Sequence, residues 1–221
     1  MRIRWYGQSS FLLDGEKAVF IDPFSEALSA SGRFRYPPIE GVVADLLLVT
    51  HEHGDHNGVD AVGGEPTVLR APGTYESPVG EVVGIASEHD AAAGTQRGPN
   101  TIFRFTLDGL SVAHLGDFGQ SALREEQRSA LGDVDVLFLP IGGGPTVGGQ
   151  AAAALVRELD PRLVIPMHYR TEAIDFLEPP DAFLAAVAAP VMNVGTSDAD
   201  AEALLGERGE PTIALLAPPL A

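Results

Sequence analysis

Short apolar segments separated by polar turns run through the first half of the chain and predict a largely β structure. Apolar alternation over residues 1–14, a turn at Asp14-Gly15 and the apolar stretch 18–21 predict three strands that begin an antiparallel sheet. Residues 25–41 have the composition of a loop. Further strands are expected at 46–50, 67–70, 82–87, 101–107 and 110–115.

The pattern changes in the second half of the chain. Helical periodicity at 122–131, 150–159 and 181–188 alternates with apolar strands, and this alternation is typical of βαβ units. The strands are expected at 134–141, 162–167 and 212–217. Because no linker, low-complexity tract or repeat divides the chain, we expect one α/β domain over residues 1–221, built on one large mixed sheet or two packed sheets.

Composition limits the chemistry. The 221 residues include no cysteine, so that disulfides, thiolate ligands and a cysteine nucleophile are excluded, and a metal would need histidine and carboxylate. A formal charge of -17 opposes binding to a nucleic acid backbone or to an anionic membrane surface. No apolar stretch of about 18 residues and no signal-peptide pattern occur, which predicts a cytoplasmic protein.

The densest polar cluster, THEHGDHN at residues 50–57, directly follows an apolar strand and holds three of the six histidines. Residues two apart in an extended segment share a face, so His51 and His53 can bind one ion. After the intervening glycine, which permits a sharp bend, Asp55 and His56 can supply ligands to a second ion. Burying so many ionisable groups without a cation would cost several kcal/mol, which is on the order of the whole stability margin.

Three further polar residues, His89, Asp117 and His168, each follow a predicted strand. His114 competes with Asp117, but in a regular strand the two residues face opposite sides. We therefore expect Asp117 to be the ligand and His114 to pack or to support a ligand. Imidazole and carboxylate without thiolate suit zinc, manganese or iron, and the sequence does not choose among these metals.

These motifs resemble those of the metallo-β-lactamase superfamily, and more closely its branch of small stand-alone hydrolases, which includes L-ascorbate-6-phosphate lactonase. The similarity extends from Trp5 to Tyr169. It rests on His-x-His-x-Asp-His after a strand at 51–56, Asp22 in FIDPF, His89, Asp117 in HLGD and His168 in VIPMHY. It implies a four-layer αββα sandwich of two mixed sheets between helix layers, with two metal ions at one edge.

The resemblance also implies a role for each residue. One ion would be held by His51, His53 and His89, and the other by Asp55, His56 and His168, with Asp117 as the bridge. Asp22 would orient a ligand histidine through its second ring nitrogen, the alternative being a turn-forming aspartate before proline.

We therefore expect two divalent ions, zinc first, with manganese or iron as alternatives. A water shared by two such ions loses its proton near neutral pH, and one ion polarises the carbonyl or phosphoryl oxygen under attack. This predicts hydrolysis of a small ester-like or phosphate-containing substrate, a lactone or a phosphodiester, by a metal-bridging hydroxide. Asp55, His56 and Asp117 would be the catalytic residues, with Asp55 or a water as proton donor.

Two other functions are compatible with the motifs. The chain could be a metal-loaded protein that binds or senses a small anion without turnover, or a nuclease, which would need a basic surface or a clamp domain. We expect a small-molecule substrate and no nucleic acid or membrane partner. A homo-oligomer is compatible with the sequence.

Weaker candidates surround these residues. Asn100 and Tyr169 could face the substrate as amide and hydroxyl donors, or serve as a turn residue and a rim aromatic. The glycine-rich stretch 140–146 lacks the spacing of a phosphate-binding loop and predicts a plain strand-to-helix connection. A loop that could overhang the site, as a phosphate anchor or as a solvated loop, contains Arg33, Arg35 and Tyr36.

Overall fold

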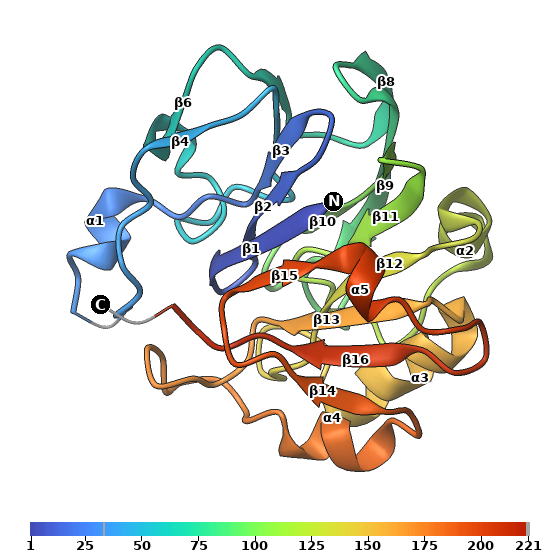
Figure 1. Cartoon of the computed structure of the whole chain (residues 1–221). Coiled ribbons are helices and arrows are strands. Elements are labelled where there is room, and N and C mark those ends of the chain that lie inside the picture. Colours follow the sequence, from blue (N-terminus) through green and yellow to red (C-terminus); the bar gives the residue numbers. More distant parts are fainter. Residues whose placement is uncertain (33, 220–221) are drawn as a thin grey trace.

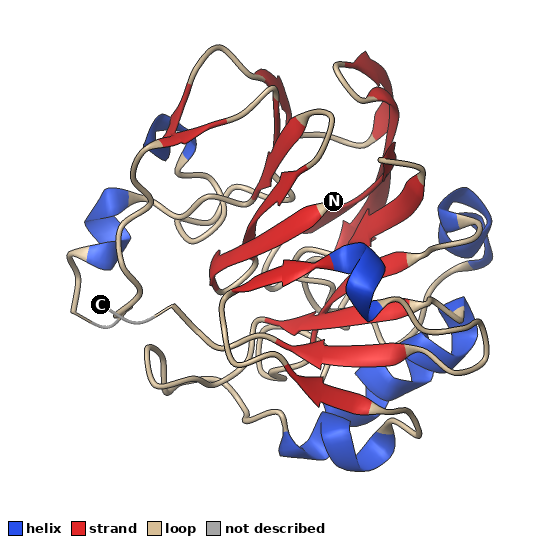
Figure 2. Cartoon of the chain, in the orientation of Figure 1, coloured by secondary structure: helices blue, strands red, loops and turns tan. Residues whose placement is uncertain are grey.

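The computed structural model describes residues 1–32 and 34–219 and contains two mixed β-sheets that pack against each other (Figures 1 and 2). The six-stranded sheet has the order β15-β1-β2-β3-β5-β7. Its strands are β1 (Arg2–Gly7), β2 (Ser10–Asp14), β3 (Ala18–Ile21), β5 (Leu46–Leu48), β7 (Thr67–Leu69) and β15 (Asp198–Asp200).

The second sheet has eight strands in the order β14-β16-β13-β12-β11-β10-β9-β8. Its strands are β8 (Gly73–Ser77), β9 (Gly80–Glu88), β10 (Pro99–Leu107), β11 (Leu110–His114), β12 (Val136–Pro140), β13 (Leu163–Met167), β14 (Val191–Asn193) and β16 (Thr212–Leu215). β4 (Val42–Val43) pairs with β6 (Val62–Gly63) in a separate two-stranded ladder. Antiparallel hairpins and parallel βαβ units thus share one sheet, as the two halves of the sequence predict.

The core lies between the inner faces of the two sheets. Phe11 of β2 and Phe138 of β12 are fully buried, and their ring centroids are 4.7 Å apart, which joins the sheets at the centre. Trp5 stacks on Phe11 from the neighbouring strand β1. One continuous apolar cluster connects residues of both sheets, so the sheets cannot separate without exposing it.

The outer layers differ between the two sheets. α2 (Glu125–Leu131), α3 (Gly149–Leu159) and α4 (Asp181–Ala186) lie beside the eight-stranded sheet, and α3 buries an apolar face against the core and α4 (Figure 1). The six-stranded sheet is covered mainly by loop, with α1 (Glu26–Ser29) and a 3-10 turn (Val59–Ala61). Aromatic side chains form this cover, with the rings of Phe24 and Phe34 4.9 Å apart.

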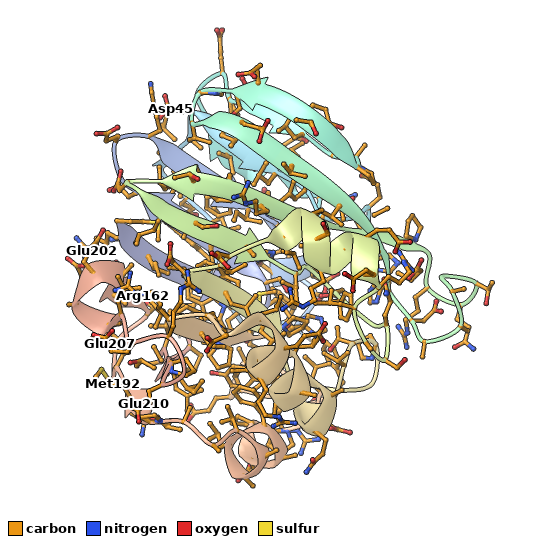
Figure 3. All side chains as sticks on the ribbon, turned by 90° about the vertical axis from the view of Figure 1, so that its right-hand side faces the viewer. Asp45, Arg162, Met192, Glu202, Glu207 and Glu210 are labelled. Atoms are coloured by element: carbon orange, nitrogen blue, oxygen red, sulfur yellow. The ribbon has the colours of Figure 1, made fainter. Side chains whose placement is uncertain are left out.

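Parallel strands bring their carboxyl ends to one edge of the molecule. β3 and β5 run parallel in one sheet, as do β12 and β13 in the other. Asp45 and Arg162, which directly precede β5 and β13, both lie on the left of Figure 3. The segments that follow these strands therefore lie at the opposite edge, where the candidate ligands gather.

Sequence patterns missed several short elements. β8 and β14 carry few buried side chains, so neither produces an apolar run. β4, β6 and β15 are each three residues or fewer and form by pairing with distant segments, and α5 (Ala201–Leu204) is a helix of four residues. Among the helices of the described residues, none has both the length and the apolar character needed to cross a bilayer.

Candidate metal centre

The cluster segment leaves β5 and folds back on itself. The backbone N–H groups of His56 and Asn57 both donate to the carbonyl of His53, which forms one helix-like turn. This turn places Asp55 and His56 beside His51. Gly54 has no positive φ, and a Cβ added to it would meet no heavy atom within 4 Å, so the expectation that this bend needs glycine is wrong. The hydrogen bonds to His53, rather than glycine's freedom, produce the bend.

Seven side chains converge at this edge. Their nitrogen and oxygen atoms form three groups, within each of which the donor atoms lie within 4.8 Å of one another. The groups are His51, His53 and His89; His51, His56 and Asp117; and Asp55, His56 and His168. His51 and His56 each belong to two of these groups. All of the residues expected as ligands are therefore brought together.

Asp22 is fully buried at the end of β3 and accepts three hydrogen bonds. Its Oδ1 accepts from the Thr50 backbone N–H (2.7 Å), and its Oδ2 accepts from the Thr50 hydroxyl (2.7 Å) and from His56 Nδ1 (2.8 Å). Because the Thr50 hydroxyl donates to Asp22, it can accept from His51 Nδ1 at 3.1 Å. This network assigns the ring protons of His51 and His56 to Nδ1 and leaves both Nε2 lone pairs toward the cluster.

The positive φ of Asp22 (51°) is part of this arrangement. Aspartate tolerates this left-handed region better than most residues, at some cost in backbone energy. A simple Asx turn before proline would not need a buried carboxylate with three donors. Asp22 therefore accepts from the ring of His56, a candidate ligand, and its role in orienting a metal ligand stays a prediction.

The eight-stranded sheet contributes His89 after β9 and His168 after β13. His89 Nδ1 donates to the Pro145 carbonyl (2.9 Å), so its Nε2 faces Asp117. The glycine-rich connection thus positions a candidate ligand, a role that its sequence did not indicate. Gly142 packs directly on the His168 backbone and leaves no space for a Cβ there. His168 itself has a φ of 50°.

The Asp117 carboxylate lies at the centre of the cluster. Its Oδ2 is 3.1 Å from His89 Nε2 and 3.2 Å from His168 Nε2. Its Oδ1 is 3.4 Å from His56 Nε2. Its two carboxylate oxygens thus lie between His56 on one side and His89 and His168 on the other.

Asn100 holds the backbone of Asp117 rather than a substrate. Its Oδ1 accepts from the Asp117 N–H (3.0 Å), and its Nδ2 donates to Ser87 Oγ and to the Leu115 carbonyl. With its amide committed and only 1% of the residue exposed, Asn100 has no donor left for substrate. The interpretation of Asn100 as an amide donor on the substrate side is therefore wrong, and it supports the site from within the protein.

Tyr169 and His114 pack in the interior. Tyr169 is 6% exposed and stacks on Trp5 with ring centroids 5.8 Å apart, so it is not a rim aromatic; burial raises the pKa of its hydroxyl. His114 is fully buried, its Nε2 donating to the Ser9 carbonyl and its Nδ1 accepting from the Gly116 N–H. Because both nitrogens of His114 are engaged, it packs and supports the adjacent loop, as the strand alternation predicts.

Two described polar side chains of the overhanging loop contact the segment after His168. The Arg35 guanidinium donates to the Glu172 carbonyl, and the Tyr36 hydroxyl lies 2.8 Å from Thr171 Oγ1. Both residues join this loop to the segment after His168. Arg33 lies outside the described residues.

Sequence reasoning missed Gln8 and Ser9, in the turn between β1 and β2. Gln8 Nε2 donates to Asp55 Oδ2 (3.4 Å), and Ser9 Oγ donates to Asp117 Oδ1 (3.4 Å). Both residues are fully buried, and Gln8 has a φ of 50°. A polar GQSS turn between apolar strands is the only signal in the sequence, and most such turns are exposed.

Burial and neighbouring charges shift the ionisation of the cluster. Burial, reinforced by repulsion from His56, lowers the pKa of His51 to about 2. Burial alone would lower the pKa of His56, but the carboxylates of Asp117, Asp55 and Asp22 raise it well above its usual value. In turn, His168 and His56 hold the pKa of Asp117 well below its usual range despite burial. The cluster thus favours a positive charge at its centre.

The residues fit divalent metal ions. His56 Nε2 is buried, makes no well-formed hydrogen bond among the described residues, and lies 3.6 Å from Asp55 Oδ2. Neutral imidazole nitrogens and carboxylate oxygens form a donor set that suits zinc, manganese or iron.

Comparisons with known proteins agree with this geometry. The family model described as "Beta-lactamase superfamily domain" matches residues 2–168. A UPF0173 metal-dependent hydrolase of Thermococcus kodakarensis is 34% identical, over 77% of this chain and 85% of the relative. One of Archaeoglobus fulgidus is 32% identical, over 88% and 94% of the two chains.

A solved structure has the same arrangement of elements. The crystal structure described as a Zn-dependent hydrolase of the metallo-β-lactamase superfamily from Thermotoga maritima superposes with a TM-score of 0.75. It is 29% identical to this chain and covers 98% of both chains. The two mixed sheets and their outer layers are therefore a known fold, as the motifs predict.

Proposed function

The chain belongs to the metallo-β-lactamase superfamily, and from this premise we propose that it is a metal-dependent hydrolase that works with two ions. The general activity, metal-dependent hydrolysis, is that of the family. The number of ions, their ligands and the ester-like or phosphate-containing substrate are our proposal.

One observation supports two ions above all others. The three donor groups together contain seven side chains, more than one tetrahedral ion can use. His51, His53 and His89 would hold one ion, and Asp55, His56 and His168 the other. Asp117 would bridge them, since its two carboxylate oxygens face histidines of both groups.

The protein's own residues would prepare this site for hydrolysis. Ions bound there would acidify a water molecule and polarise the carbonyl or phosphoryl oxygen of a substrate. Asp22 and Thr50 hold the imidazole of His56 so that Nε2 points inward. The Asp55 carboxylate is the more accessible one, with 26% of its side chain exposed against 3% for Asp117, so Asp55 can pass a proton to a leaving group.

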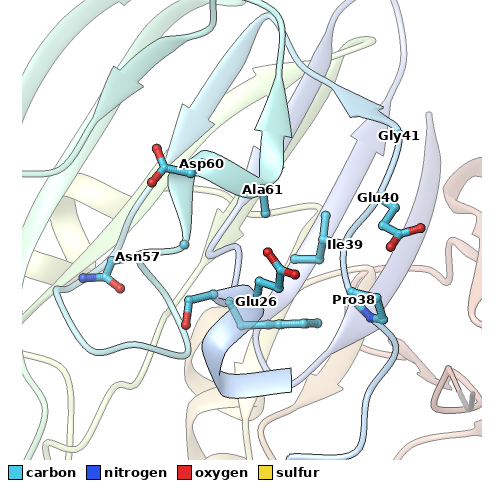
Figure 4. A pocket seen from close by; sticks show the side chains of 11 residues that line it. Glu26, Pro38, Ile39, Glu40, Gly41, Asn57, Asp60 and Ala61 are labelled. Carbon is cyan, nitrogen blue, oxygen red and sulfur yellow. The ribbon is translucent and has the colours of Figure 1, made fainter. Parts of the chain in front are cut away.

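Two cavities adjoin the candidate ligands, and a third does not. The cavity in Figure 4, of about 530 Å³, is lined by Glu26, Glu40 and Asp60 but by none of the seven ligands. Its carboxylates would repel an anionic substrate, and it offers no donor group to an ion pair. The cavities beside Asp55 and beside His51 are therefore the places where a substrate can reach the cluster.

The test combines metal content with turnover. We expect about two ions per chain in protein purified without chelator, and hydrolysis within a panel of p-nitrophenyl phosphodiesters, phosphomonoesters and lactones. Zinc, manganese and iron forms are assayed in turn. Asp117→Asn, which is nearly isosteric, should reduce turnover by orders of magnitude while the protein still folds. One tightly held ion or none would refute the two-ion proposal.

Two alternatives give different results in the same assays. A sensing protein would bind phosphate or a carboxylate in its metal form and hydrolyse nothing on the panel. A nuclease would cleave single-stranded or transfer RNA, which the net charge of -17 opposes. Five expectations stay predictions: zinc as the native metal, similarity to the ascorbate-phosphate lactonase branch, a single domain over 1–221, a cytoplasmic location and a homo-oligomer.

A further inference from the structure

An apolar cavity of about 520 Å³ opens beside Asp55. Leu28 lies on α1, Phe34 comes from the loop that follows this helix, and Phe176 comes from the segment after His168. The backbone of Gly54 and the side chains of Ser31 and Asp55 complete the lining. One candidate metal ligand thus faces a cavity whose other large side chains are hydrocarbon.

Phe176 is unusual among the large apolar side chains of the described residues. With 53% of its surface exposed, it is the one aromatic among the strongly exposed ones. Val43, Val191 and Met192 are also exposed, but none of them lines a cavity beside the candidate ligands. Phe176 lines the same cavity as Asp55, and ligand pockets are lined mainly by hydrophobic and aromatic side chains.

The wall of the cavity is preformed. Phe34 is 2% exposed and packs against Phe24 and Tyr36, with ring centroids 4.9 and 5.0 Å away. The Arg35 N–H donates to the Ala173 carbonyl, which ties the two loops that form the cavity to each other. A substrate group that enters would therefore not need to order these loops first.

Charge is distributed unequally around the cluster. Among the described residues that line the apolar cavity, Asp55 is the one that carries a charge, so an anionic group beside it would meet its carboxylate. On the other side, a cavity of about 360 Å³ adjoins His51 and His53 and is lined by Arg70 and Arg97. Arg70 pairs with Glu52 at 3.0 Å, whereas the Arg97 side chain has no ion pair among the described residues. Anionic substrate groups are thus favoured on the His51 side and apolar ones on the Asp55 side.

We propose that the site takes acyl substrates, esters or lactones, whose hydrocarbon part lies in the cavity formed by Leu28, Phe34 and Phe176. This inference rests on the proposed function, because it places the scissile carbonyl at the candidate ions beside Asp55. In the reaction, water adds to the acyl carbon and the bond from that carbon to the alcohol oxygen breaks. The products are a carboxylate, an alcohol and one proton.

The test uses binding as well as turnover. Acetate, butyrate and hexanoate are titrated by calorimetry into the metal-loaded protein, since each places a carboxylate at the ions and a chain of different length in the cavity. A fully buried CH₂ strengthens binding by about fourfold. Because the cavity is open on one side, we expect hexanoate to bind at least about tenfold more tightly than acetate.

Phe176→Ala removes the exposed aromatic ring from the cavity wall. It should reduce the ratio of hexanoate affinity to acetate affinity to below about threefold. Met192→Ala is the matched control, because Met192 is also an exposed apolar residue (45%) but lies on β14, away from the cluster (Figure 3). This control variant should keep the wild-type ratio. The same three proteins are assayed with p-nitrophenyl acetate, butyrate and hexanoate, where kcat/KM should follow the same order.

The outcomes separate this inference from the proposed function. Equal binding of the three acids, or an unchanged ratio in Phe176→Ala, overturns the inference even if the esters are hydrolysed. A chain-length ratio that Phe176→Ala abolishes, without hydrolysis of these esters or of any phosphodiester, phosphomonoester or lactone on the panel, supports the cavity and contradicts the proposed activity. If sedimentation shows a dimer that Phe176→Ala dissociates, and the chain-length ratio is unaffected, the surface is a subunit contact and the inference is wrong.

Discussion

Replacing Asp22 by asparagine should weaken metal binding although Asp22 itself contacts no ion. The Oδ1 of the asparagine can still accept from the Thr50 N–H. The amide NH₂ that replaces Oδ2 cannot accept from the Thr50 hydroxyl or from His56 Nδ1, which lie 2.7 and 2.8 Å away from Oδ2 in the native protein. Asparagine also tolerates the φ of 51°, so the substitution adds little backbone strain.

The magnitude follows from these contacts. Hydrogen bonds to a charged group contribute about 1.5–3 kcal/mol, and loss of a residue that orients a metal ligand costs about 10–100-fold in metal affinity. A 10–100-fold loss equals about 1.4–2.7 kcal/mol, which agrees with losing the one charged hydrogen bond that acts directly on a proposed ligand, from His56 Nδ1 to Asp22. The effect should be larger at the His56 ion than at the His51 ion, because His51 is reached only through Thr50.

A competition titration against a chromophoric chelator measures both affinities, and urea unfolding of the metal-free protein measures stability. Asp45→Asn is the matched control. The Asp45 carboxylate accepts from the Ala18 N–H (2.9 Å) and from Lys17 (3.1 Å), at the opposite ends of the same β3 and β5 strands. This control should leave metal affinity within about twofold of the wild type.

A result that keeps both wild-type affinities in Asp22→Asn, with a loss of stability alone, would refute this reasoning. Asp22 would then serve only to join β3 to the cluster segment. The ring protons of His51 and His56 would have to be placed by other contacts.

The remaining predictions concern the proposed ligands, the buried histidine and two glycines. His89→Ala should lower the metal content on elemental analysis and His114→Gln should not; the reverse result would exchange their roles. Burial lowers the folded pKa of His114 to about 4, from 6.5 when unfolded, so its stabilising effect is complete above pH 6.5 and is lost as the pH falls from 6.5 to 4. The difference in free energy of unfolding between the wild type and His114→Gln, measured with urea, should therefore decrease by on the order of 3 kcal/mol as the pH is lowered from 6.5 to 4. A difference that does not change with pH would contradict the burial argument. Gly116→Ala should destabilise the protein by about 2–4 kcal/mol, because φ is 56° and a Cβ would collide with Asn100 and Thr50. Gly54→Ala, where a Cβ meets open space, should change the free energy of unfolding by less than about 0.5 kcal/mol, and equal losses in the two variants would be inconsistent with this geometry.

The local sequence alone determined the types of candidate ligand and much of their placement. His51, His53, Asp55 and His56 lie within six residues, so the covalent chain keeps them close whatever the rest of the fold does. Apolar runs marked the buried strands, and candidate ligands at their ends were identifiable because a strand must leave the core where polar residues begin. The same alternation separated His114 from Asp117.

Tertiary structure decided which distant residues support and surround the cluster. Periodicity reports which face of its own element a residue occupies, but not which residue of another element meets it. The contacts of Gln8 with Asp55, of Ser9 with Asp117 and of Asn100 with the Asp117 backbone arise from the packing of the two sheets. Phe34 and Phe176 share one cavity although they lie on separate loops far apart in the chain. Such contacts depend on the order in which strands pair, a long-range property that no local pattern encodes.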